Sequence, residues 1–172
     1  MRYLTIVRHA KAAAGDASVR DFDRPLTVKG RAQAEVLREW ARDPEALGRY
    51  GPTTALVSAA ARARETYAVA FAGTSFVHAL ETSELIYNGR RDVTAEDLLA
   101  ELATVDPGNE SLLVVGHNPT VFELALSLSD REIPALAKHK YPLGAALVFA
   151  LELGETIGLR RYSFVESFVP EV

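Results

Sequence analysis

The sequence alternates between short runs of apolar and β-branched residues and longer stretches with the apolar spacing of amphipathic helices. The runs that predict buried strands are residues 3–7, 54–58, 75–80 and 111–115. The stretches that predict helices are residues 27–42 and 60–71, a segment starting at Thr94 and a segment starting at Asn118-Pro119. This alternation predicts crossover connections, and hence a mostly parallel sheet with helices on both faces.

Two further β-type runs, residues 145–152 and 158–165, are joined by a glycine-containing turn and predict a C-terminal antiparallel hairpin. The expected fold class is therefore α/β, a three-layer sandwich with a mixed, mostly parallel sheet that ends in this hairpin. A length of 172 residues fits one domain spanning residues 1–172.

Three residues carry helix-start signals. Thr27 is placed to cap the first helix, and Thr94 with Asp97 three residues later has the pattern of a capping box. Asn118 before Pro119 predicts an N-cap followed by proline at the first helical position.

Composition excludes several classes of protein. The chain has no cysteine, which removes disulfides, thiolate metal sites and cysteine-nucleophile phosphatases. Its net charge of −4 disfavours nucleic-acid binding. Its apolar runs are far shorter than the roughly 20 residues of a membrane span. Arg8-His9 interrupts the first apolar run before a signal-peptide core could form. We therefore expect a cytoplasmic protein with neither nucleic-acid nor membrane partners.

Polar residues follow three of the predicted strands where each strand ends. Arg8-His9 follows the first, Ser58 and then Arg62 follow the second, and Gly116-His117-Asn118 follows the fourth. Ligands of open α/β sheets bind outside the carboxyl ends of the strands, and helix N-termini add a positive dipole end there. Two arginines and two histidines are therefore expected to meet at one edge of the sheet.

Such a site suits a compact dianion, and phosphate is the natural candidate. Guanidinium groups bind phosphate oxygens through two parallel hydrogen bonds, and a neutral imidazole can attack phosphorus to form a phosphohistidine. Phosphoryl transfer asks the protein mainly for positioning and for stabilisation of charge on the equatorial oxygens. The residues can meet this demand without a metal or another cofactor.

The same segments resemble motifs of the histidine phosphatase superfamily, also called the phosphoglycerate mutase-like superfamily. Arg8-His9-Ala10 resembles its Arg-His-Gly signature, residues 58–66 its Ser-Pro-x-x-Arg-Ala-x-Gln-Thr element, and residues 116–119 its Gly-His-Asn element. Residues 23–30 and 141–145 are similar to stretches of the short SixA-like phosphohistidine phosphatase branch. The resemblance runs nearly end to end in the right order.

Three positions depart from the pattern of the superfamily. Ala10 replaces the common glycine, Ala59 the usual proline and Glu65 the usual glutamine. The backbone at residue 10 is expected to tolerate the added methyl group. The changes at residues 59 and 65 can alter the local loops, but neither removes a phosphate ligand.

The resemblance implies a role for each matching residue. His9 is the expected nucleophile, Arg8 and Arg62 the ligands of the phosphoryl oxygens, and His117 a hydrogen-bond donor to the same group. The phosphate-binding set is therefore Arg8, His9, Arg62 and His117. Glu84 stands where many members carry their proton-donating acid.

Competing interpretations of two segments are weaker. Asp21-Phe22-Asp23 has the spacing of a magnesium-dependent phosphatase motif, but no buried strand precedes it. Ser58 has alanine-rich flanks and is expected to lack an adjacent base, which favours a turn or capping role over that of a nucleophile.

We therefore predict a metal-independent phosphatase that works through a phosphohistidine intermediate, with phosphohistidine on another protein as the favoured substrate. Mutase activity is less favoured because residues 84–111 leave room for about one helix and no long lid. Two alternatives stay open: a phosphatase of small-molecule phosphomonoesters in the same superfamily, and a phosphate-binding module without turnover.

Overall fold

The computed structural model describes residues 2–15, 17–51, 53–87, 93–105, 111–129, 131–151 and 162–172. Its strands are β1 (Arg2–Arg8), β2 (Thr53–Ser58), β3 (Val77–Ser83), β4 (Ser111–Gly116), β5 (Ala146–Leu151) and β6 (Tyr162–Phe168). Its α-helices are α1 (Val28–Arg42), α2 (Ala61–Ala70), α3 (Ala95–Val105) and α4 (Thr120–Leu128). Short 3₁₀ helices are η1 (Asp21–Asp23), η2 (Leu47–Tyr50) and η3 (Pro134–His139). Within these residues, no helix is long and apolar enough to cross a bilayer.

The six strands form one mixed sheet in the order β3-β2-β4-β1-β5-β6. Strands β3, β2, β4 and β1 run parallel to their neighbours, and β5 pairs antiparallel with both β1 and β6. The predicted α/β class and the C-terminal antiparallel hairpin are therefore confirmed. The turn of the hairpin lies in residues 152–161, outside the described residues.

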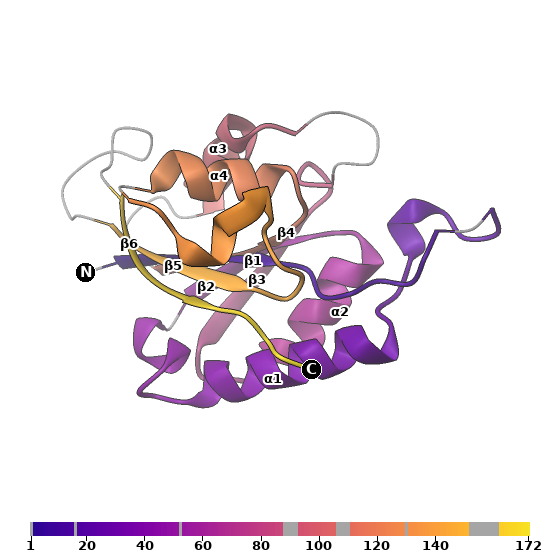
Figure 1. The fold of residues 1–172 in the computed structure, drawn as a ribbon, viewed down its shortest axis with the longest axis horizontal. Coiled ribbons are helices and arrows are strands. Elements are labelled where there is room, and N and C mark those ends of the chain that lie inside the picture. Colours follow the sequence, from indigo (N-terminus) through magenta and orange to yellow (C-terminus); the bar gives the residue numbers. More distant parts are fainter. Residues whose placement is uncertain are drawn as a thin grey trace.

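Helices cover both faces of the sheet, as Figure 1 shows, with α3 and α4 above it and α1 and α2 below it. Successive strand residues point to opposite faces, so Ile6 and Val114 join the core under α3 and α4. Their neighbours Val7 and Val115 join the core against α1 and α2. The predicted three layers follow from this alternation.

Two of the three predicted helix starts are confirmed. Thr27 caps α1 by accepting a hydrogen bond from the Gly30 N–H at 3.0 Å. Thr94 and Asp97 form a reciprocal capping box, each side chain accepting from the other residue's N–H at 3.1 Å.

The prediction that Asn118 caps α4 is wrong. Pro119 itself is the N-cap residue, and no side chain caps the helix. Backbone bonds close the first turn instead, from the Val121 N–H to the His117 carbonyl at 3.0 Å and from the Glu123 N–H to the Pro119 carbonyl at 3.0 Å. The side-chain oxygen of Asn118 is buried without a partner among the described residues.

Strand β3 is displaced along the chain from its predicted range, residues 75–80. Parallel pairing with β2 carries it to Ser83, which lies opposite Ser58 in the register. As a result Glu84 directly follows the end of β3, at the same sheet edge where β2 ends.

Candidate active site

The two histidines follow neighbouring parallel strands. Arg8, the last residue of β1, lies opposite Gly116, the last residue of β4. The His9 N–H extends the pairing by donating to the Gly116 carbonyl at 3.0 Å. His9 and His117 therefore emerge side by side, with ring centroids 4.9 Å apart and planes inclined at 53°.

A backbone carbonyl fixes the tautomer of His9. Its Nδ1 lies 2.7 Å from the Ala10 carbonyl oxygen, which can only accept a hydrogen bond. The proton of the neutral ring is therefore on Nδ1, and Nε2 keeps its lone pair. This is the arrangement that a nucleophilic imidazole requires.

The surroundings keep His9 neutral. Its pKa is lowered from the usual 6.5 to about 4, chiefly by burial; the bond to the Ala10 carbonyl opposes the shift, and the positive charges of Arg62, Arg8 and Arg24 add to it. Burial also lowers the pKa of His117, as do the neighbouring His9 and Arg62. Both imidazoles are thus uncharged near neutral pH.

Arg8 and Arg62 are anchored by backbone carbonyls at this edge of the sheet. Arg8 donates through Nη1 to the Tyr141 carbonyl. Arg62, on the first turn of α2, is 6% exposed and donates through Nη1 to the Asp21 carbonyl at 2.7 Å. The Nε of each arginine is buried without a partner among the described residues, as is Nδ1 of His117. Buried donors of this kind are usually satisfied by a partner, so the site retains capacity to bind an anion.

Sequence reasoning missed the environment of His117. Its Nε2 lies 2.7 Å from the Ser58 hydroxyl oxygen, and both residues are buried. The expectation that Ser58 lacks an adjacent base is wrong, because the parallel pairing of β2 and β4 brings the two together across 59 residues of chain. Of the two expected roles, turn or cap, Ser58 has the turn role: it accepts from the Ala60 N–H at 3.4 Å, while Ala60 itself is the N-cap residue of α2.

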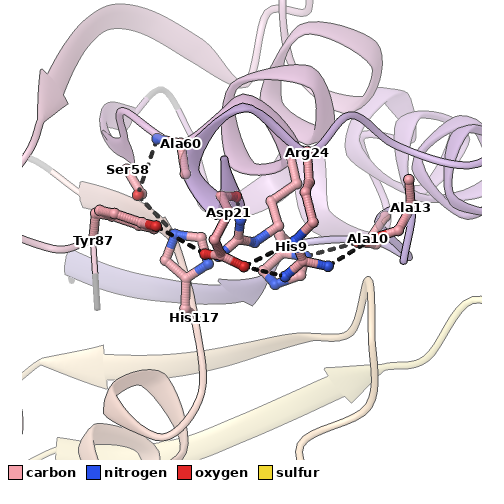
Figure 2. A network of polar contacts seen from close by, with 10 residues as sticks. His9, Ala10, Ala13, Asp21, Arg24, Ser58, Ala60, Tyr87 and His117 are labelled. Carbon is pink, nitrogen blue, oxygen red and sulfur yellow. Dashed lines mark hydrogen bonds and ion pairs between the residues drawn. The ribbon is translucent and has the colours of Figure 1, made fainter. Parts of the chain in front are cut away.

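The loop before α1 contributes a carboxylate that sequence reasoning did not place in the site. Asp21 accepts from Arg62 Nη2 at 3.2 Å, from Arg24 Nη2 at 2.6 Å and from the Tyr87 hydroxyl at 2.8 Å. Figure 2 shows its carboxylate between Tyr87, His117 and Arg24. These contacts lower its pKa from 3.8 to about 2 despite the opposing effect of burial, so Asp21 is ionised.

Arg24 braces this loop and also lies near His9. It donates to the Ala13 carbonyl at 2.7 Å and so ties the two ends of the segment between β1 and α1 together. Its charge is among those that lower the pKa of His9. In the sequence, the signal for Arg24 is its place within residues 23–30, the stretch that resembles the SixA-like branch.

Aromatic rings flank the histidine pair. The Tyr87 ring lies 6.0 Å from the His117 ring in an edge-on arrangement and 5.0 Å from the Phe22 ring. The Arg62 guanidinium lies 5.7 Å from the centroid of Tyr87. Tyr87 thus links the loop that carries Asp21 to the histidines.

Glu84 is placed near the site edge but not within the cluster. It is exposed and follows β3 directly. Among the described residues, no hydrogen bond or ion pair joins its side chain to any of the four phosphate-site residues. The structure thus brings together Arg8, His9, Arg62 and His117 and leaves Glu84 outside their contacts.

Two positions that depart from the superfamily pattern are accommodated. Ala10 is fully buried, and its N–H donates to the Thr66 hydroxyl at 3.0 Å. Glu65 accepts from the Leu26 N–H at 3.2 Å and from Arg31 at 2.8 Å. Glu65 therefore ties α2 to the start of α1.

Comparisons with known proteins agree with this arrangement. No established family profile matches the chain. The uncharacterized protein Rv1276c of Mycobacterium tuberculosis is 30% identical over 147 residues, covering 83% of this chain and 85% of the relative. A structure from Agrobacterium tumefaciens, assigned as the phosphohistidine phosphatase SixA, superimposes with a TM-score of 0.79 at 27% identity, covering 99% of each chain. A SixA protein histidine phosphatase complexed with tungstate shares the fold, with a TM-score of 0.74 at 24% identity over 98% of this chain and 97% of its own.

The doubly covered mixed sheet, with two histidines at the ends of adjacent strands, belongs to the histidine phosphatase superfamily. Within that superfamily the chain is a member of the SixA-like branch. Its neighbours support a phosphatase of the histidine type.

Proposed function

We propose that this protein is a phosphohistidine phosphatase, and that it removes phosphoryl groups from histidine side chains of other proteins through a phosphohistidine intermediate on His9. The observation that carries the proposal is the His9–Ala10 hydrogen bond, which leaves Nε2 of a neutral imidazole as the nucleophile beside a second imidazole 4.9 Å away. A SixA structure that holds tungstate, a tetrahedral dianion, supports a site of this kind.

In the first step, Nε2 of His9 attacks phosphorus in line with the bond to the leaving nitrogen. The P–N bond of the substrate breaks, the new P–N bond forms on His9, and the released imidazole takes a proton from water. In the second step, water attacks phosphorus, the P–N bond to His9 breaks, and inorganic phosphate leaves. The His9 imidazole returns to its starting state.

The remaining site residues stabilise the transferring group. Arg8 and Arg62 bind the equatorial oxygens, where charge accumulates in the transition state. Their backbone anchors at Tyr141 and Asp21 limit reorganisation when the group arrives. His117 donates a hydrogen bond to the same oxygens as a neutral imidazole.

The proton donors available in the site favour a phosphoramidate substrate over a phosphomonoester. A leaving nitrogen is basic enough to gain its proton easily, whereas an alkoxide leaving group needs a positioned acid. The carboxylate within the cluster, Asp21, is ionised and bound by cations, which makes it a poor proton donor. Glu84 is assigned as the proton donor for substrates that require one, and its exposed position at the end of β3 suits a bulky protein substrate.

The experiment is a substrate panel combined with trapping of the intermediate. We expect turnover of a phosphohistidine protein or peptide to exceed turnover of phenyl phosphate and sugar phosphates, and rapid quenching to find phosphate on His9 by mass spectrometry. His9→Ala should abolish both signals. His78→Ala, which removes an exposed histidine on β3, serves as the matched control and should retain both.

Each alternative has its own outcome. Faster turnover of a small phosphomonoester would replace the proposed substrate and keep the intermediate. Phosphate binding without turnover or label on His9 would indicate a binding module and overturn the proposal.

A further inference from the structure

The Ser58 hydroxyl and the His117 ring form a buried pair whose position is set by the sheet. Ser58 ends β2 and His117 follows β4, and the register pairs Val57 with Val115 just before them. Ser58 is 0% exposed and His117 is 4% exposed, with 2.7 Å between Oγ and Nε2. The pairing of β2 with β4 therefore fixes the Ser58–His117 contact.

The direction of this hydrogen bond follows from the other partner of Ser58. Its oxygen accepts from the Ala60 N–H at 3.4 Å, at the start of α2. Among the described residues, Nε2 of His117 is the acceptor within reach of the hydroxyl proton. Ser58 therefore donates to Nε2, and a neutral ring that accepts at Nε2 carries its proton on Nδ1.

We infer that Ser58 is a positioning residue that holds neutral His117 in the tautomer with the proton on Nδ1, so that this N–H donates to the phosphoryl group bound at His9. The inference rests on the proposed function. Nδ1 of His117 is buried without a partner in the described part of the chain, and Figure 2 shows the Nε2 side of the ring turned to Ser58. The opposite tautomer would direct a lone pair at the negatively charged oxygens.

Because the His117 ring is neutral, its tautomer determines which nitrogen can donate to the phosphoryl group. A protonated imidazole would donate from both nitrogens and would need no partner to choose between them. Burial and the nearby His9 and Arg62 disfavour the charged form of His117, and Asp21 opposes them only in part. The hydroxyl of Ser58 therefore decides which nitrogen carries the one proton.

The same contact could in principle describe a serine nucleophile with His117 as its base. Two observations oppose this. The Ser58 hydroxyl lies in a fully buried residue, and no carboxylate accepts from Nδ1 of His117 among the described residues, so the orienting group of a serine triad is missing.

The direct test uses the unmodified protein. Long-range ¹H–¹⁵N NMR spectra distinguish protonated from unprotonated ring nitrogens, and comparison with His117→Asn assigns the signals. We expect the proton of His117 on Nδ1 at neutral pH. A proton on Nε2 would overturn the inference whether or not the protein is a phosphatase.

The kinetic test compares three variants. Ser58→Ala should lower kcat about tenfold with little change in KM; the guide is the 10- to 100-fold cost of losing the partner that orients a metal-bound histidine, taken at its lower end. Ser58→Thr keeps the hydroxyl and should recover most of the rate. Thr53→Val removes another buried hydroxyl of β2, bonded to the Phe76 carbonyl at the far end of the strand, and should leave kcat unchanged.

The outcomes separate this inference from the proposed function. If Ser58→Ala retains full kcat while phosphate still labels His9, the inference fails and the proposed function stands. If phosphate labels Ser58 in the unmodified protein, both fail. A mixture of His117 tautomers in Ser58→Ala, with the Nδ1 form alone in Thr53→Val, supports the inference independently of any rate.

Discussion

The carboxylate of Asp21 lies 3.2 Å from Nη2 of Arg62, a guanidinium assigned here to the phosphoryl group. Its other oxygen is 2.6 Å from Nη2 of Arg24. A phosphoryl dianion that binds to Arg62 is therefore repelled by the Asp21 carboxylate, which already pairs with Arg62 and Arg24.

Asp21→Asn should therefore tighten binding of a tetrahedral dianion. The single amide oxygen can still accept on one side of the side chain, and the Asp21 backbone carbonyl still anchors Arg62, so the guanidinium keeps its main anchor. Because the carboxylate is half-exposed, removing its charge should favour the dianion by about 1 kcal/mol at most, roughly fivefold in Kd. Calorimetric titration with tungstate measures the effect, with Asp23→Asn, whose carboxylate pairs with Arg20 outside the cluster, as control. Weaker tungstate binding in Asp21→Asn alone would show that its charge chiefly holds the arginines.

The pH titration of His9 should depart from that of an exposed histidine. Burial and three nearby arginines lower its pKa to about 4, so the ring should stay neutral and nucleophilic well below pH 6.5. NMR titration in phosphate-free buffer should show the His9 ring signals changing near pH 4. A midpoint for His9 near 6.5 would contradict the burial that the fold gives it.

The same shift affects stability in a defined direction. Between about pH 4 and pH 6.5 the unfolded chain binds a proton at His9 that the folded chain does not, so the free energy of unfolding should fall as pH decreases through this window. Urea unfolding at pH 7 and pH 5 measures the change. His9→Asn should lessen the loss, and an unchanged pH dependence in that variant would exclude His9 as its source.

Glu84→Gln should separate substrates by their need for a proton donor. We expect the rate on phenyl phosphate to fall about 100-fold, within the usual range for a general acid. The rate on a phosphohistidine peptide should change little, because its leaving nitrogen gains a proton readily. Glu81→Gln, an exposed carboxylate on β3, is the matched control. An equal fall on both substrates would contradict this account of the leaving group.

Much of the fold could be predicted because its signals are local. The apolar run 111–115 is short and bounded, and the helix starts at Thr27 and Thr94 follow from side chains that bond within three residues. The end of β3 was misplaced because Ser83 belongs to the strand through pairing with Ser58, a long-range contact with no local pattern.

The site residues likewise fall into those predictable from local strand signals and those placed by long-range contacts. Arg8 ends β1, and His9 and His117 directly follow the ends of β1 and β4, so topology alone predicts that they meet. Asp21 enters the site from η1, a single 3₁₀ turn in the segment before α1, and its contacts with Arg62 and Tyr87 span 41 and 66 residues of chain. No periodicity encodes such an approach, and the Ser58–His117 bond was missed for the same reason.

One glycine shows how the site is supported from a distance. Gly30, in the first turn of α1, packs so closely that a Cβ there would lie 2.1 Å from the Lys11 carbonyl oxygen. That carbonyl accepts from the Thr27 N–H at 2.9 Å and lies two residues beyond His9. The helix start and the segment that follows the nucleophile are thus in direct backbone contact.

Gly30→Ala should therefore destabilise the protein even though alanine favours a helix interior by about 1 kcal/mol. Overpacking costs about 1–3 kcal/mol, and relief of the clash must move Lys11, so kcat should fall as well. Gly15→Ala is the control, since a Cβ at that position would meet only the Arg24 side chain at 3.9 Å. Urea unfolding and steady-state rates on the same samples measure both effects. A Gly30→Ala protein as stable and active as Gly15→Ala would contradict the close approach of α1 to the strand end that carries His9.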